Sequence, residues 1–121
     1  MEIFVKLLYA ILSAAVFILA ATDQSAAQQR AVLGHGNVSC QTWSADRRLG
    51  KGDSVTRVAW ILGYITAFNE YGSTPQGDVS AGSSTQKITT AIDDYCNQHP
   101  TDTIHRASAA LIAEFRQTKA R

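Results

Sequence analysis

An apolar run near the N-terminus limits the rest of this chain to one small domain. A single lysine, Lys6, precedes about fifteen mostly apolar residues from Leu7 to Ala21, and the small residues Ser25-Ala26-Ala27 follow. This order is typical of a secretory signal that is cleaved after a small residue, whereas a membrane-spanning helix needs about 20 apolar residues. We therefore predict that residues 1–27 are a cleavable signal peptide. The rest of the chain is then expected to be soluble, outside the cytoplasm and free of any membrane segment.

The 94 residues after the predicted signal contain both cysteines of the chain, Cys40 and Cys96. A domain of this size buries only about 60–65% of the surface of its unfolded chain, so its stability is marginal without a staple. Exported cysteines that are far apart in sequence and lack a C-x-x-C pattern favour a structural disulfide over a redox site. We predict a Cys40–Cys96 disulfide that stabilises the fold by about 4 kcal/mol.

The segment before the first cysteine has no helical period. Residues 28–38 contain the glycines Gly34 and Gly36, and glycine is a residue typical of loops. Untethered segments near the end of a domain are commonly mobile. We therefore predict a flexible leader over residues 28–38 and a helical domain over residues 39–121.

Apolar residues at intervals of three and four predict helices in that domain. We expect a short helix over residues 42–48, a central helix over residues 54–71 that is capped by Asp53, and a polar loop over residues 73–83. A third helix is expected to begin at residue 84 and to end at His99-Pro100. A fourth helix is expected to follow, capped by Thr101 or Asp102. Cys96 shares one face of the third helix with other apolar residues, so we expect it to point toward the core. The fold class is predicted as all-α, with three main helices, a short N-terminal helix and one disulfide.

The titratable residues do not form a pattern typical of catalysis or metal binding. His99 and His105 are six residues apart across a predicted helix break, so they do not share a helix face as metal ligands do. Asp93 and Asp94 are neighbours on a helix and point about 100° apart, so we expect them to be solvated. Basic residues form no stripe with interleaved aromatics, which argues against a nucleic-acid partner. We predict a protein that is not an enzyme and holds neither a cofactor nor a metal.

The central helix carries more apolar surface than a small domain buries easily. One stripe is expected to face the core: Val55, Val58, Ala59, Leu62, Ile65 and Asn69. Trp60, Ile61, Tyr64 and Phe68 widen the apolar surface beyond that stripe. Part of it is therefore expected to face a protein partner.

Three segments together resemble the HdeA/HdeB family of periplasmic acid-stress chaperones. They are Ser39-Cys-Gln-Thr-Trp43, Val58-Ala-Trp-Ile-Leu-Gly-Tyr64 and Ile92-Asp-Asp-Tyr-Cys-Asn-Gln-His-Pro100, followed by an amphipathic C-terminal helix. The resemblance implies a periplasmic protein with a Cys40–Cys96 bridge and a hydrophobic segment, Val58 to Phe68, that is buried when folded and exposed to unfolding clients in acid. The residues assigned to client binding are Val58, Trp60, Ile61, Tyr64, Ile65 and Phe68. The oligomeric state is left open between monomer and homodimer.

Acid is expected to act on the charge of the exported chain. That chain holds ten lysines and arginines against eight carboxylates, a net charge of +2, which rises to about +13 once the carboxylates and three histidines are protonated. A carboxylate that caps a helix also stops stabilising it when protonated. Repulsion would then loosen the helices while the disulfide keeps the chain collapsed.

A second resemblance gives the alternative function. The sequence Gly63-Tyr-Ile65 with Ala67, the residues Tyr95 and His99-Pro100, and the alanine-rich Ala107–Ala113 are similar to periplasmic immunity proteins that neutralise type VI secretion effectors. That resemblance implies a rigid surface that binds one toxin partner at neutral pH.

Overall fold

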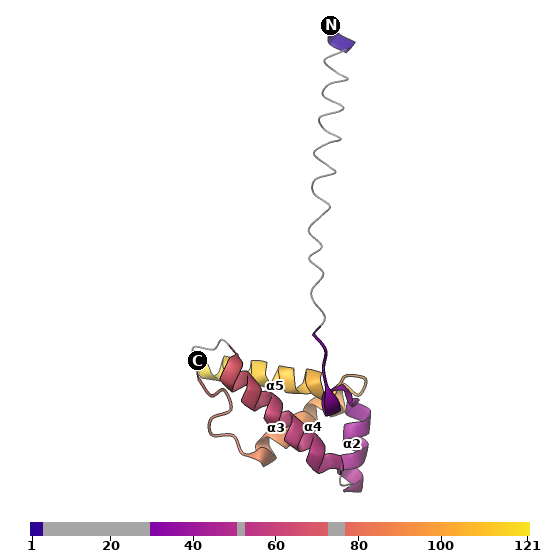
Figure 1. The fold of residues 1–121 in the computed structure, drawn as a ribbon, viewed down its shortest axis with the longest axis vertical. Coiled ribbons are helices and arrows are strands. Elements are labelled where there is room, and N and C mark those ends of the chain that lie inside the picture. The colour runs from indigo at the N-terminus through magenta and orange to yellow at the C-terminus, as the bar shows by residue number, and fades with distance from the viewer. Residues whose placement is uncertain (4–29, 51–52, 73–76) are drawn as a thin grey trace. The chain divides into compact units, whose positions relative to one another are not determined.

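Residues 1–3, 30–50, 53–72 and 77–121 are described by the computed structural model. Residues 31–121 belong to one unit, distinct from residues 1–30. The elements of this unit are a 3-10 helix, η1 (Gly34–Asn37), and the helices α2 (Cys40–Leu49), α3 (Asp53–Tyr71), α4 (Thr85–Gln98) and α5 (Ile104–Lys119) (Figure 1). The described residues contain no strand, and the prediction of an all-α fold with three main helices and a short one is confirmed. Most of the predicted signal peptide lies outside the described residues.

Hydroxyl side chains start three of the helices. Ser39 Oγ accepts from the backbone N–H of Thr42 at 3.1 Å, and Ser84 caps α4 in the same way. Thr103, not Thr101 or Asp102, caps α5. The predicted cap Asp102 is engaged elsewhere, because its carboxylate accepts from the Tyr95 hydroxyl at 2.6 Å. Asp53 is the first residue of α3 and lies within the helix.

Among the described residues, no helix has the length and apolar character needed to cross a bilayer.

The disulfide joins the first helix to the third, as predicted. Cys40 and Cys96 are bonded, with their Cα atoms 4.7 Å apart, and both side chains are buried. The backbone holds the start of α2 in place for this bond: the Cys40 N–H donates to the Asp102 carbonyl at 2.7 Å, and the Ile104 N–H donates to the Val38 carbonyl at 2.9 Å. The turn between α4 and α5 therefore fixes the N-terminus of α2.

The core lies between α5 and the helices α2, α3 and α4 that pack against it. α5 packs against both α3 and α4, and α2 lies across one end of the unit (Figure 1). The buried apolar side chains include Trp43, Ile61, Ile65, Ile88, Ile92, Ile104, Leu111 and Ile112. Trp43 donates its indole N–H to Asp93 at 2.8 Å, and Arg47 pairs with the same carboxylate at 2.8 Å. Asp93 thus joins α4 to α2, so its prediction as a solvated residue is wrong, whereas Asp94 is exposed.

The core-facing stripe predicted for α3 is rotated relative to the observed one. Val55 is 73% exposed and Ala59 is also exposed. The buried positions are Arg57, Ile61 and Ile65. The physical reason is Arg57, which turns inward to form an ion pair with Asp46 of α2. With Arg57 in the buried stripe of the helix, Val55 and Ala59 lie on the solvent side.

The part of the predicted polar loop that the structure describes is anchored by a valine. Val79 is buried in the core. Its backbone N–H donates to the Asn69 side-chain oxygen at 3.0 Å, and Asn69 donates to the Asp78 carboxylate at 2.8 Å. These bonds tie the loop to the last turns of α3.

Candidate binding surface

The six residues assigned to client binding divide into two groups. Ile61 and Ile65, at 0% and 3% exposed, belong to the core. The other four are half-buried and pack against the core from outside: Val58, Trp60, Tyr64 and Phe68. A folded protein can offer only the second group to a partner.

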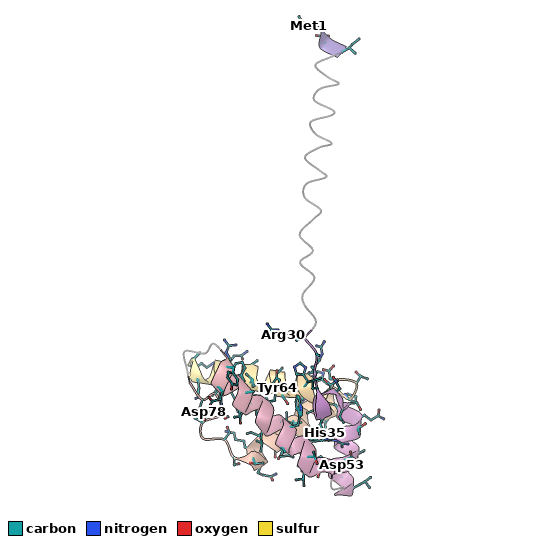
Figure 2. The ribbon with its side chains drawn as sticks, viewed as in Figure 1. Met1, Arg30, His35, Asp53, Tyr64 and Asp78 are labelled. Carbon is teal, nitrogen blue, oxygen red and sulfur yellow. A yellow bond between two sulfur atoms is a disulfide. The ribbon has the colours of Figure 1, made fainter. Side chains whose placement is uncertain are left out.

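Trp60 and Tyr64 form an aromatic stack on α3. They lie one helical turn apart, a spacing at which side chains on a helix are neighbours. Their ring centroids are 5.3 Å apart and the rings are nearly parallel, at 17°. His105 of α5 meets Tyr64 edge to face at 5.3 Å, and its Nε2 is 3.3 Å from the Tyr64 hydroxyl. We call the residues Trp60, Tyr64 and His105 the aromatic surface; Tyr64 is labelled in Figure 2.

Trp60 of the aromatic surface is covered by the N-terminal segment of the same unit, Ala31–Val38. The Trp60 indole Nε1 donates to the Leu33 carbonyl at 2.9 Å. Gly36 is buried against the indole, and a Cβ added there would lie 2.5 Å from Trp60 Cη2, which is too close for any side chain. The turn is closed by Asn37, whose Nδ2 donates to the Val32 carbonyl at 2.6 Å. Only a glycine at position 36 lets the backbone approach the ring this closely.

Part of the predicted leader has regular structure. Residues 34–37 form η1, which contacts both α3 and α5. The Gly34-His35-Gly36 sequence, which is too short for a phosphate-binding loop, is here the part that lies against Trp60. Sequence reasoning missed it because the contact joins residues 24 positions apart. The signal that could have revealed it is the combination of two closely spaced glycines with a tryptophan left over from the core.

The aromatic surface contains no aspartate, glutamate, lysine or arginine. Partial burial raises the pKa of Tyr64 above its ordinary value, so its hydroxyl stays protonated across the physiological range. The surface therefore offers two aromatic faces, one indole N–H donor and a phenol–imidazole pair.

A concave region lies between α2 and α4. It has a volume of about 430 Å³ and is lined by Ser44, Arg47, Arg48, Asp93 and Asn97. The hydrogen bond that Arg47 donates to Asp93 raises the pKa of Arg47 above its ordinary value. This guanidinium is therefore paired within the protein. Arg48 is exposed.

Nowhere in the described ranges do three histidine, cysteine, aspartate or glutamate side chains come together as a metal-binding group. The His99 ring lies against the Tyr95 ring, with centroids 4.5 Å apart and the rings tilted by 38°. Comparison of the chain with protein-family models, with curated proteins and with solved structures found no match.

Proposed function

We propose that this protein is a periplasmic chaperone of the acid-stress kind, which binds unfolding client proteins at low pH. The observation that carries the proposal is that Trp60, a half-buried side chain of the aromatic surface, is covered by a short N-terminal segment. Such a surface is exposed when the segment leaves, while the disulfide and the core remain. The resemblance to the HdeA/HdeB family supports the same function, with residues 1–27 as the export signal and with binding, not catalysis, as the activity.

Two of the hydrogen bonds that the structure describes join the N-terminal segment to the helices. The Trp60 indole N–H of α3 donates to the Leu33 carbonyl, and the Ile104 N–H of α5 donates to the Val38 carbonyl. The Leu33 side chain itself is 77% exposed and adds little apolar contact. Segments with few buried apolar contacts open at a lower free energy than the core does. The segment is therefore the first part of the unit expected to detach.

Acid adds charge on both sides of the covered surface. His35 lies in η1 and His105 lies on the aromatic surface, next to Arg106 of α5, while Arg30 directly precedes the segment. At pH 2 to 3 the carboxylates of the chain lose their negative charge, so the positive charges near the segment and the surface are no longer compensated. Like charges repel, and this favours release of the segment in acid.

The test is suppression of aggregation of a client protein at pH 2 to 3 and at pH 7. We expect protection and binding of a hydrophobic dye in acid, and neither at pH 7. Trp60→Ala should weaken the protection in acid several-fold; the matched control is Val55→Ala, on the same helix but outside the aromatic surface. Trp60→Ala also destabilises the neutral fold by roughly 2 kcal/mol because the side chain is half-buried, so circular dichroism must establish that both variants are in the same state. Absence of both dye binding and protection in acid would overturn the proposal.

The concave region between α2 and α4 favours the alternative function, a neutral-pH immunity protein. The Arg47–Asp93 pair makes its wall rigid, and the exposed Arg48 offers a guanidinium to an acidic partner. If this alternative holds, Arg48→Glu should abolish binding of an effector toxin at pH 7. Trp60→Ala should leave the affinity for the toxin unchanged.

A further inference from the structure

The aromatic surface already holds a piece of polypeptide, residues Leu33–Asn37 of its own chain. We infer that this surface recognises short glycine-containing segments of unfolded polypeptides, and that the N-terminal segment occupies it as a built-in ligand. The inference rests on the proposed function, because it names the part of a client that the surface would hold. The bound segment shows which chemistry the surface selects.

The first requirement on a ligand is a backbone carbonyl. The Trp60 indole N–H donates to the carbonyl of Leu33 at 2.9 Å. An indole nitrogen only donates, so an occupant must bring an acceptor to this point. The Leu33 side chain points to solvent, and the contact is therefore with main chain, which every polypeptide supplies.

The second requirement is a pair of glycines with one residue between them. Gly34 has a φ of +66°, a left-handed conformation that favours glycine, although a Cβ there would keep an ordinary 3.5 Å from Trp60 Cδ1. Gly36 is required by space, since a Cβ would overlap both the indole and the Val32 side chain. The first glycine is thus selected by backbone conformation and the second by the closeness of the ring.

These requirements fit an unfolded client better than a folded one. An unfolded chain exposes its backbone carbonyls and its glycines, whereas a folded protein pairs most of its backbone groups internally. The occupant that we assign is therefore a carbonyl-Gly-x-Gly segment of an unfolded polypeptide. It competes with Leu33–Asn37 for the same indole.

The experiment uses the exported full chain at pH 7 without any client. In the variant Gly36→Val the segment cannot lie against Trp60, so the indole N–H resonance of Trp60 should move toward its solvent-exposed position. The Trp43 indole, which donates to Asp93, is the internal reference. Adding a synthetic peptide with the sequence of residues 30–38 should return the Trp60 resonance toward its wild-type position with saturation. The same peptide carrying the Gly36→Val change should bind about tenfold more weakly or not at all.

If the Gly36→Val variant does not fold, a second measurement on the wild-type protein tests the inference. Excess wild-type peptide added to the wild-type protein should raise amide hydrogen exchange of residues 31–38 several-fold, because the displaced segment loses its protection. Equal binding of both peptides, or no binding of either, would overturn the inference. Dimer formation by Gly36→Val in sedimentation would also overturn it, because the occupant would then be a second copy. Peptide binding at pH 7 without client protection in acid would instead remove the proposed function and leave the inference intact.

Discussion

The ion pair between Arg57 and Asp46 is a buried polar contact between two helices of this fold. The two residues are only 7% and 8% exposed, and they join α3 to α2. Asp53 lies farther away, with its carboxylate 4.0 Å from the same guanidinium. Replacing both partners of a buried pair by apolar residues is often neutral, whereas removing one partner leaves a buried charge without compensation. The pair therefore makes the α2–α3 contact sensitive to any loss of the Asp46 charge.

Asp46→Asn should lower the free energy of unfolding at pH 7 by about 3–5 kcal/mol, because the Arg57 charge stays buried without its partner. Asparagine has nearly the shape of a protonated aspartate, so this variant reports what loss of that charge does to the contact. Urea unfolding followed by circular dichroism gives the value. The control Asp94→Asn, at an exposed position, should change stability by less than about 0.5 kcal/mol. Equal stability of Asp46→Asn and wild type would mean that the pair does not constrain the fold.

The candidate site was only partly predictable from the sequence. Trp60 and Tyr64 were identified because they exceed what a helix of a small domain buries. Their cover was not, since the fit of Gly36 to Trp60 exists only in three dimensions. The apolar spacing of the helix predicts that Val55 faces the core. Arginine is rarely buried, and no local pattern indicates that Arg57 finds its partner on another helix.

Among the elements, the loop after α3 carries a contact that depends on pH. The Asp78 carboxylate accepts from the hydroxyl and backbone N–H of Ser80, at 2.7 and 2.9 Å, and from Asn69 at 2.8 Å. Lys119 of α5 donates to the Asp78 carbonyl. These hydrogen bonds, with a smaller contribution from the Lys119 charge, lower the pKa of Asp78 below its ordinary value. Asp78 lies toward the opposite end of α3 from Asp53 (Figure 2).

A carboxyl with a lowered folded pKa stabilises the fold above its unfolded pKa, about 3.9 for aspartate, and stops doing so as the pH falls through the folded value. Asp78→Asn should therefore melt below wild type at pH 7, and the difference should shrink toward zero as the pH falls to about 2. Thermal melts across this range measure it. Glu70→Gln, at an exposed position of α3, is the control and should show no such trend. A difference that keeps its size at pH 2 would rule out this role for Asp78.

The helices were predictable to within about two residues, apart from the caps, because their signals are local. Apolar period and hydroxyl residues mark where each begins, as Ser84 does for α4. The two parts predicted as irregular, η1 and the loop at Val79, were less predictable than the helices. They acquire their structure from contacts with α3 and the core. Their glycines and serines predict turns but do not indicate against what the turns pack.

The whole unit depends on one covalent link. Cys40 and Cys96 are 56 residues apart in sequence and join α2 to α4 within the core. Because a small domain has little free energy of unfolding to spare, this link decides whether the core survives when the N-terminal segment detaches. The proposed function requires that it does.

Cys96→Ser should lower the free energy of unfolding by about 4 kcal/mol, the chain-entropy value for a loop of this length. The melting temperature from circular dichroism should fall, and much of the helical signal should be lost near physiological temperature. In the wild type, both cysteines are buried, so a thiol reductant should act slowly until denaturant is added. A melting curve identical to that of wild type would show that the helices hold together without the link.

The most direct measurement is client protection by Gly36→Val at pH 7. This variant displaces the N-terminal segment without acid, so it separates uncovering of the aromatic surface from every other effect of low pH. We predict that it suppresses aggregation of a client at pH 7, where wild type does not, while its helical circular dichroism stays the same. A Gly36→Val protein that is folded and has an exposed Trp60 indole, yet protects no better than wild type at pH 7, would contradict the account.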